Sequence, residues 1–303
     1  MFRRLLLPTA ALVVLALPAG ASAAWAPPGD ATLRPGSQTA TEGSGQCTSN
    51  FVFENGGDVL IGQAAHCAGT GEATDTDGCD ATALPLGTKV DVEGAEHRGE
   101  LVYSSWTEMQ RRGETDAGTC AANDFALVQL DARDVAKVNP SMPFWGGPTA
   151  LGADDAAAGQ AVFSYGNSGL RLGLELLKPK AGLHLGRANA GWTHEIATLT
   201  PGVPGDSGSA VLSADGRALG TLSTLALAPV PGTNGVGDLG REVAYARGTA
   251  GFSGLELAVG TEPFEASDPA RTAREIAARV QTDAAAAASG KLVQRALSFV
   301  GLG

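Results

Sequence analysis

Three side chains of the kinds used in nucleophilic catalysis lie far apart in this sequence of 303 residues: His66, Asp124 and Ser207. A serine hydroxyl is a weak nucleophile, so a neutral histidine must remove its proton. That histidine needs a carboxylate, which fixes its tautomer and stabilises the imidazolium that forms. A fold that brings the three together could cleave an acyl bond through a covalent acyl-enzyme.

The local sequence around each residue fits such a role. Ser207 lies in Gly-Asp-Ser-Gly at 205–208, where the glycines permit a tight loop. The backbone N–H groups of Gly205 and Ser207 can then converge on one point and form an oxyanion hole. His66 lies in Ala-Ala-His-Cys at 64–67, and Asp124 lies directly before the apolar run 125–130. Taken singly, these motifs also fit a turn, a hydrogen-bonded polar residue and a strand cap.

Together the three motifs resemble those of the trypsin/chymotrypsin-like serine proteases, as a secreted bacterial member. The order His, Asp, Ser is that of this family and differs from the subtilisin and α/β-hydrolase orders. The resemblance extends over about residues 44–262. It implies an all-β fold of two packed six-stranded antiparallel β-barrels with a C-terminal helix, in which His66 and Asp124 come from the first barrel and Ser207 from the second. It also implies a disulfide between Cys47 and Cys67, and endopeptidase activity without a metal or organic cofactor.

The same resemblance assigns the specificity pocket to Pro201, Ser223 and Leu225. Trypsin-like members carry an Asp six positions before the nucleophile, where this chain has Pro201. A buried Lys or Arg of the substrate would find no counter-charge there. We therefore expect cleavage after small or medium apolar residues, in a slot narrowed by Leu225. Ser223 is expected to contact the substrate backbone and to hydrogen-bond toward Asp124.

One departure from the family concerns activation. No basic residue followed by Ile-Val-Gly-Gly precedes the domain, so a freed N-terminus cannot pair with Asp206 beside the nucleophile. We expect an internal arginine, Arg171, to take that place. Two alternatives to a peptidase stay open: a catalytically silent, protease-shaped binding module, and an esterase on the same scaffold.

The elements that must position these residues are predicted to be short strands. Apolar runs separated by Gly, Asn or Asp clusters, with no helical pattern between them, favour an all-β sandwich or barrel. A long loop is expected at 231–240. The predicted strands cover residues 51–53, 58–62, 89–92, 100–103 and 125–130, then 160–165, 181–187, 195–199, 209–212 and 218–227.

The chain divides into five predicted parts. Residues 1–23 have the basic, apolar and small-residue regions of a signal peptide, so we expect a secreted, extracellular protein; a retained N-terminal anchor is the alternative. The other parts are an extended lead-in (24–46), the first barrel (47–140), the second barrel (141–262) and a helical tail (263–303). The tail helix should begin at Asp268 and pack on the body, with contact to a membrane or cell wall as the alternative.

Composition limits the partners. The net charge is −11, and removal of the signal peptide takes away two arginines and no acids, which leaves −13. Such a chain is a poor ligand for nucleic acid. No later segment is long and apolar enough for a transmembrane helix. We expect a monomer that acts on protein or peptide substrates.

The four cysteines are expected to form disulfides after export. Their spacing contains no C-x-x-C, which argues against zinc, and sequence alone leaves three pairings open. The residues are Cys47, Cys67, Cys79 and Cys120. The carboxylates of Asp75, Asp77 and Asp80 could suggest calcium, but a solvated disulfide loop is the favoured interpretation, so no metal site is predicted.

Overall fold

The computed structural model describes residues 24–71, 76–152, 156–225 and 232–266, together with 278, 281–285, 287 and 289–291. The predicted signal peptide lies outside the described residues, as do Asp75 and the predicted helix start at Asp268. Of the tail, residues 281–285 are helical. No helix in the described part of the chain is long and apolar enough to cross a membrane.

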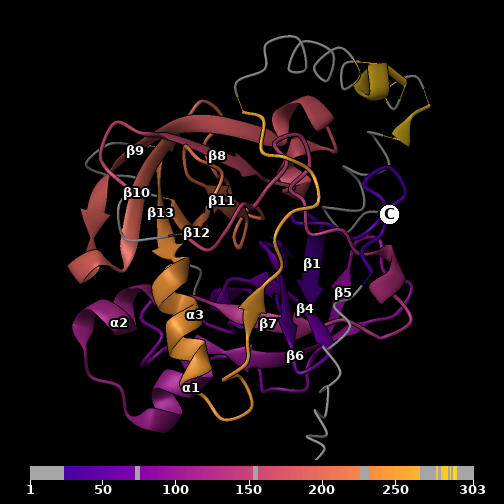
Figure 1. The fold of residues 1–303 in the computed structure, drawn as a ribbon. Coiled ribbons are helices and arrows are strands. Elements are labelled where there is room, and N and C mark those ends of the chain that lie inside the picture. Colours follow the sequence, from indigo (N-terminus) through magenta and orange to yellow (C-terminus); the bar gives the residue numbers. More distant parts are fainter. Residues whose placement is uncertain are drawn as a thin grey trace, which may run out of the picture.

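The first half folds into an eight-stranded antiparallel sheet with the order β14-β3-β4-β7-β6-β5-β1-β2. Its strands appear in the lower half of Figure 1. They are β1 (Gln38–Thr41), β2 (Gln46–Thr48), β3 (Val52–Asn55), β4 (Asp58–Gln63), β5 (Lys89–Val92), β6 (Gly99–Ser104), β7 (Ala126–Gln129) and β14 (Glu256–Leu257).

The second half is a closed six-stranded antiparallel barrel with the order β10-β13-β12-β11-β8-β9. The all-β prediction and the barrel of the second half are thus confirmed. The barrel strands lie in the upper half of Figure 1. They are β8 (Ala161–Tyr165), β9 (Pro179–Ala188), β10 (Thr193–Thr198), β11 (Ala210–Leu212), β12 (Ala218–Leu225) and β13 (Thr233–Asp238).

The prediction of six strands in the first half was wrong. The lead-in supplies β1, and β14 returns from the C-terminal side to pair with β3, Leu257 opposite Phe53. At the other edge, β2 faces the barrel: the N–H of Thr48 donates to the carbonyl of Ser207 at 2.8 Å. The edge strand of the sheet thereby holds the loop that carries Ser207.

The prediction of a long loop at 231–240 was also wrong. Residues 233–238 form β13, which pairs with both β10 and β12 and so closes the barrel. Two glycines and three polar residues in this segment hide the alternation that is typical of a strand. The chain continues into α3 (Leu239–Arg247), where the side chain of Asp238 caps the helix by accepting the N–H of Arg241.

Two short helices interrupt the first half, where the sequence predicted none. They are α1 (Ser105–Arg112) and α2 (Ala117–Ala122). The turn η1 (Ala65–Ala68), a 3₁₀ helix, follows β4 directly. Helix α3 runs from the barrel to α1 on the near side of the molecule in Figure 1, so that it links the two halves.

Both disulfides pair the cysteines in chain order, and the described residues include no free cysteine. Cys47–Cys67 joins β2 to η1, as the resemblance implied, and Cys79–Cys120 joins a loop to α2. The first bond therefore fixes the short turn that carries His66.

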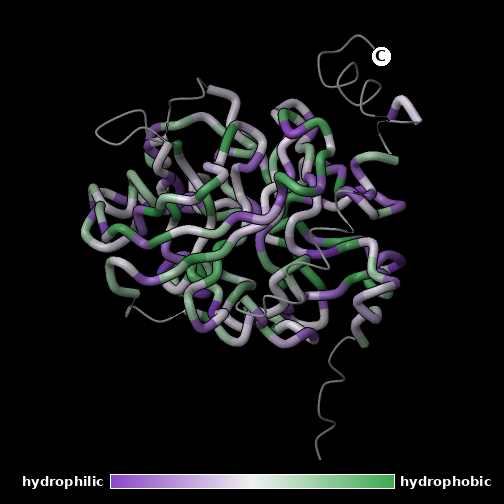
Figure 2. The backbone as a smooth tube through the Cα atoms, turned by 90° about the horizontal axis from the view of Figure 1, so that it is seen from above, coloured by the Kyte–Doolittle hydropathy of each residue, from purple (hydrophilic) through white to green (hydrophobic). Residues whose placement is uncertain are grey.

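One apolar cluster packs the two halves together. Figure 2 shows hydrophobic and hydrophilic stretches alternating along the chain throughout the body. This cluster joins side chains of β3 and β4 to side chains of the barrel and α3. Its fully buried members include Phe51, Phe53, Leu60, Phe125, Leu212 and Leu239. The contact fixes the sheet relative to the barrel and so fixes the residues that the two halves bring to the cleft between them.

Candidate active site

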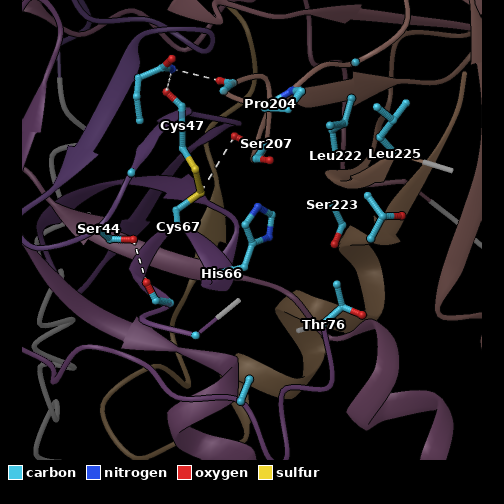
Figure 3. Close-up of a pocket in the computed structure, with 18 of the residues that line it drawn as sticks. Ser44, Cys47, His66, Cys67, Thr76, Pro204, Ser207, Leu222, Ser223 and Leu225 are labelled. Atoms are coloured by element: carbon cyan, nitrogen blue, oxygen red, sulfur yellow. Dashed lines mark hydrogen bonds between the residues drawn. A yellow bond between two sulfur atoms is a disulfide. The ribbon is translucent and has the colours of Figure 1, made fainter. Parts of the chain in front are cut away.

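A cleft of about 680 Å³ opens between the sheet and the barrel. His66 lines it from the first half, and Ser207 and Ser223 line it from the second. Figure 3 shows Ser207 and the His66 ring facing the same part of this cleft, beside the Cys47–Cys67 disulfide. The catalytic residues predicted from the two halves thus approach the same opening.

His66 and Asp124 meet because β4 and β7 are paired. Gln63 at the end of β4 lies opposite Ala126 at the start of β7, so the residues just beyond these ends are neighbours. Asp124 Oδ1 accepts the backbone N–H of His66 at 2.9 Å, and Oδ2 lies 2.6 Å from His66 Nδ1. Both oxygens of the carboxylate therefore orient the histidine.

The electrostatics of this pair stabilise its ionised form. Burial lowers the pKa of His66, but the charge and hydrogen bond of Asp124 raise it by more, so it lies above the ordinary histidine value. Burial raises the pKa of Asp124, while His66 and Ser223 lower it by more, so it lies below the ordinary value. Asp124 is thus held as a carboxylate, which is the form that stabilises an imidazolium.

Ser223 completes the surroundings of Asp124. Its hydroxyl donates to Asp124 Oδ2 at 2.5 Å, as expected from the sequence. Ser223 belongs to β12, so the barrel contributes a hydrogen bond to a carboxylate of the other half. Asp124 is only 6% exposed, and these contacts leave it little freedom to turn.

The loop of Ser207 is held from both sides. The N–H of Gly208 donates to the carbonyl of Leu222 at 2.7 Å, and the hydroxyl of Thr48 donates to the carbonyl of Gly205 at 2.8 Å. Gly205 has φ +92°, and a Cβ there would lie 2.6 Å from an oxygen of Gln46. Within the described residues, no acceptor takes the N–H of Gly205 or of Ser207.

Asp206 lies under this loop and is fully buried. Arg171 donates to it through Nε at 3.3 Å and through Nη2, which confirms the predicted pairing. Lys180 Nζ adds a second ion pair at 2.9 Å, and the N–H groups of Ser168 and Val203 donate at 3.0 and 3.1 Å. Burial raises the pKa of Asp206, but the two cations lower it by more. The residue before the nucleophile is therefore a fixed anion.

The specificity side of the cleft differs in one respect from the prediction. Ser223 and Leu225 line it as expected, but Gly202 does so in place of Pro201. The carbonyl of Pro201 instead accepts a hydrogen bond from Arg171 at 3.0 Å.

Asn234 is a pocket residue that the sequence did not reveal. It lines the cleft and is only 1% exposed. Its Oδ1 accepts the N–H of Gly202 at 2.8 Å, and its Nδ2 donates to the carbonyls of Gly202 at 3.3 Å and Thr224 at 3.0 Å. The carboxamide thereby bridges the two walls of the pocket. Recognition of β13 as a strand would have been the signal that placed it there.

The described residues that could hold a metal are engaged otherwise. Two of the three groups contain disulfide cysteines, whose sulfurs carry no thiolate. The third contains Glu96, His97 and Asp134, and here the ammonium of Lys137 lies 2.9 Å from Glu96 and 2.7 Å from Asp134. That lysine already neutralises the carboxylates.

No protein-family model and no curated protein matches this sequence. Solved structures with a similar course of the chain include Thermobifida fusca protease A, at 17% identity over 76% of this chain and 100% of that one, with a TM-score of 0.47. A Nocardiopsis protease aligns at 19% identity over 74% and 98%, with a TM-score of 0.46, and Cellulomonas bogoriensis chymotrypsin at 18% over 75% and 98%, with a TM-score of 0.45. These likenesses are too distant to transfer a function, which has to follow from the geometry of the site.

Proposed function

We propose that this chain is a secreted serine endopeptidase that hydrolyses peptide bonds of protein or peptide substrates through an acyl-enzyme. The observation that carries the proposal is the bond of 2.6 Å between His66 Nδ1 and Asp124, in a cleft that Ser207 also lines. With Nδ1 held by Asp124, the other ring nitrogen, Nε2, remains to take the proton of the serine hydroxyl.

The reaction requires two displacements at the substrate carbonyl. Ser207 Oγ attacks the carbonyl carbon while His66 takes the hydroxyl proton. The tetrahedral oxyanion that forms accepts hydrogen bonds from the backbone N–H groups of Gly205 and Ser207. Collapse breaks the C–N bond, and His66 returns the proton to the leaving amine. Water then attacks the acyl-enzyme by the same route, and Ser207 regains its proton from His66. No metal or organic cofactor takes part in these steps.

Several features of the loop support this assignment. The N–H groups of Gly205 and Ser207 have no acceptor among the described residues, so they are available to an oxyanion. The buried Asp206, held by Arg171 and Lys180, fixes the backbone between them. The two disulfides support export to an oxidising compartment.

We infer a preference for small or medium apolar residues on the acyl side of the cleaved bond. Leu222 and Leu225 line the pocket, and the carboxamide of Asn234 crosses it with its hydrogen-bonding groups already engaged. Among the described residues that line the pocket there is no carboxylate, so the charge of a Lys or Arg side chain would find no partner among them.

A fluorophosphonate probe tests the proposal. The mature chain should be labelled, Ser207→Ala should not, and Ser209→Ala should still be labelled, because the Ser209 hydroxyl is buried and donates to the carbonyl of Asp206. Failure of the folded wild type to react would favour a silent binding module. Labelling combined with hydrolysis of esters but of no member of a peptide library would favour an esterase.

A further inference from the structure

Glu242 is a carboxyl group buried without a cation behind the site. It lies in the first turn of α3 and is 0% exposed. Thr221 donates its hydroxyl to Glu242 Oε2 at 2.8 Å, and Asn50 donates to the same hydroxyl at 3.3 Å. Oε1 has no hydrogen-bond partner, and no ion pair to Glu242 occurs among the described residues.

The carboxyl group borders the backbone that leads to Asp124. A Cβ on Gly237 would lie 2.1 Å from Glu242 Oε1 and 3.4 Å from the carbonyl oxygen of Ala122, so only a glycine there leaves room for the carboxyl. On the other side, Thr221 precedes Ser223 by two residues on β12, and Ser223 donates to Asp124. Glu242 therefore hydrogen-bonds the strand that carries Ser223 and lies near the backbone that precedes Asp124.

The two charged side chains that act on Glu242, Asp124 and Asp238, both disfavour a carboxylate there. Asp124 lies two residues before β7 and Asp238 at the N-cap of α3, and Tyr103 on β6 is a further titratable neighbour. Arg187 and His194, the cationic or ionisable neighbours in the barrel, are engaged by Asp238 instead. Burial raises the pKa of Glu242 well above its ordinary value, and the charges of Asp124 and Asp238 raise it further, whereas the hydroxyl of Thr221 and the backbone N–H of Asp124 lower it by less. An isolated buried carboxylate is far costlier than its neutral form.

We propose that Glu242 is a positioning residue for Asp124 and performs this role as a neutral, protonated acid. The inference rests on the proposed function, since it assigns Asp124 to the triad. A neutral Glu242 accepts the Thr221 hydroxyl and supports β12 without adding a second anion next to Asp124. An ionised Glu242 would repel Asp124 and raise the basicity of His66.

The variant Glu242→Gln keeps the shape and neutrality of the group. We expect kcat/KM within about 3-fold of the wild type at pH 7–8, and the acid limb of its pH profile at the same midpoint. If Glu242 were ionised in the active protein, the substitution would remove a negative charge and so lower the pKa of His66. The midpoint of the acid limb would then move down by about 0.5 pH unit or more. Such a shift overturns the proposal.

A second pair of variants tests positioning. Glu242→Ala and Thr221→Val remove the contact, and both should lower kcat per titrated active site by about 10-fold with KM little changed. Unchanged kcat per active site in a folded Thr221→Val would mean that the contact serves stability alone, and would overturn the positioning role. If Glu242→Ala does not fold, Thr221→Val still decides the point.

A stability measurement remains informative even if the chain has no peptidase activity. The pKa of Glu242 is raised in the folded state, so the folded protein binds one more proton than the unfolded chain between the two pKa values, and stability falls as pH rises. The unfolding equilibrium constant of the wild type should therefore rise toward tenfold per pH unit relative to Glu242→Gln between pH 5 and 7. The exposed Glu195→Gln serves as the matched control for the effect of a Glu-to-Gln substitution as such. A ratio of the two unfolding equilibrium constants, wild type to Glu242→Gln, that stays constant with pH would contradict the proposal that Glu242 is a neutral acid.

Discussion

Lys180 Nζ and Asp206 Oδ2 lie 2.9 Å apart, and neither side chain is exposed to solvent. Arg171 binds the same carboxylate, so two cations share one anion beneath the loop of Ser207. Burial lowers the pKa of Lys180 to about 8; Asp206 opposes this shift, and Arg171 adds to it. Arg171 carries out the pairing that the sequence predicted, whereas Lys180 leaves the cluster with an excess positive charge.

This excess predicts opposite effects for the two cations. Lys180→Met should leave the free energy of unfolding at pH 7 unchanged or higher, because the remaining pair is neutral. Arg171→Met should lower it by about 3–5 kcal/mol, because Asp206 loses its main partner and the carbonyl of Pro201 loses a donor. Denaturant unfolding of both variants at pH 7 measures the difference, and a larger loss for Lys180→Met would contradict it.

The same cluster has a predicted pH dependence. The folded-state pKa of Lys180 is about 8 and the unfolded value is about 10.4, so the folded protein binds fewer protons between these values. Stability contributed by this residue should therefore rise with pH across that window, by about 3 kcal/mol in total. The test compares the free energy of unfolding of the wild type and of Lys180→Met from pH 8 to 10.5. A difference that stays constant over this range would refute the lowered pKa of Lys180.

The triad makes a quantitative prediction. Ser207→Ala and His66→Ala should each lower kcat by about 10⁶, and Asp124→Asn by about 10⁴. Activity requires neutral His66, so kcat/KM should fall as pH drops through a pKa above the ordinary histidine value. The charge of Asp124 raises that pKa, so Asp124→Asn should move the acid limb to lower pH. Activity above about a tenth of the wild type in Ser207→Ala would exclude its role as nucleophile.

The sequence was most informative where the chemistry is local. The motifs around His66 and Ser207 combine a reactive side chain with the glycines or cysteine that fix its loop, so they can be recognised without a structure. Lys180, Asn234 and Glu242 carry no such local signal. Their roles arise from packing between strands and a helix that are distant in sequence, and β13, which contains Asn234, is too rich in glycine to resemble a strand.

The two disulfides should differ in their effect on catalysis. Each disulfide closes a loop, and loss of either bond should lower the free energy of unfolding by about 3–4 kcal/mol. Only Cys47–Cys67 borders the site, since Cys67 Sγ lies 4.0 Å from the carbonyl oxygen of Ser207. Replacing this pair by serines should also lower kcat, whereas the same change at Cys79–Cys120 should leave kcat within about 3-fold. Equal effects on kcat would mean that the first bond acts through stability alone.

The last prediction concerns substrate choice. In the pocket, Asn234 bridges Gly202 and Thr224 and uses both hydrogens of its amide in doing so. It therefore closes the slot and offers a substrate cation no free acceptor. For matched peptides, kcat/KM should be highest with Ala, Val or Leu on the acyl side and lower by orders of magnitude with Arg, because an unpaired buried charge costs several kcal/mol. Asn234→Ala removes the bridge and should raise the ratio of Phe to Ala turnover, while Leu225→Ala, at a 38% exposed wall position, should raise it less. Faster cleavage after Arg by the wild type, or a Phe to Ala ratio that stays constant in Asn234→Ala, would show that this side chain does not form the end of the pocket.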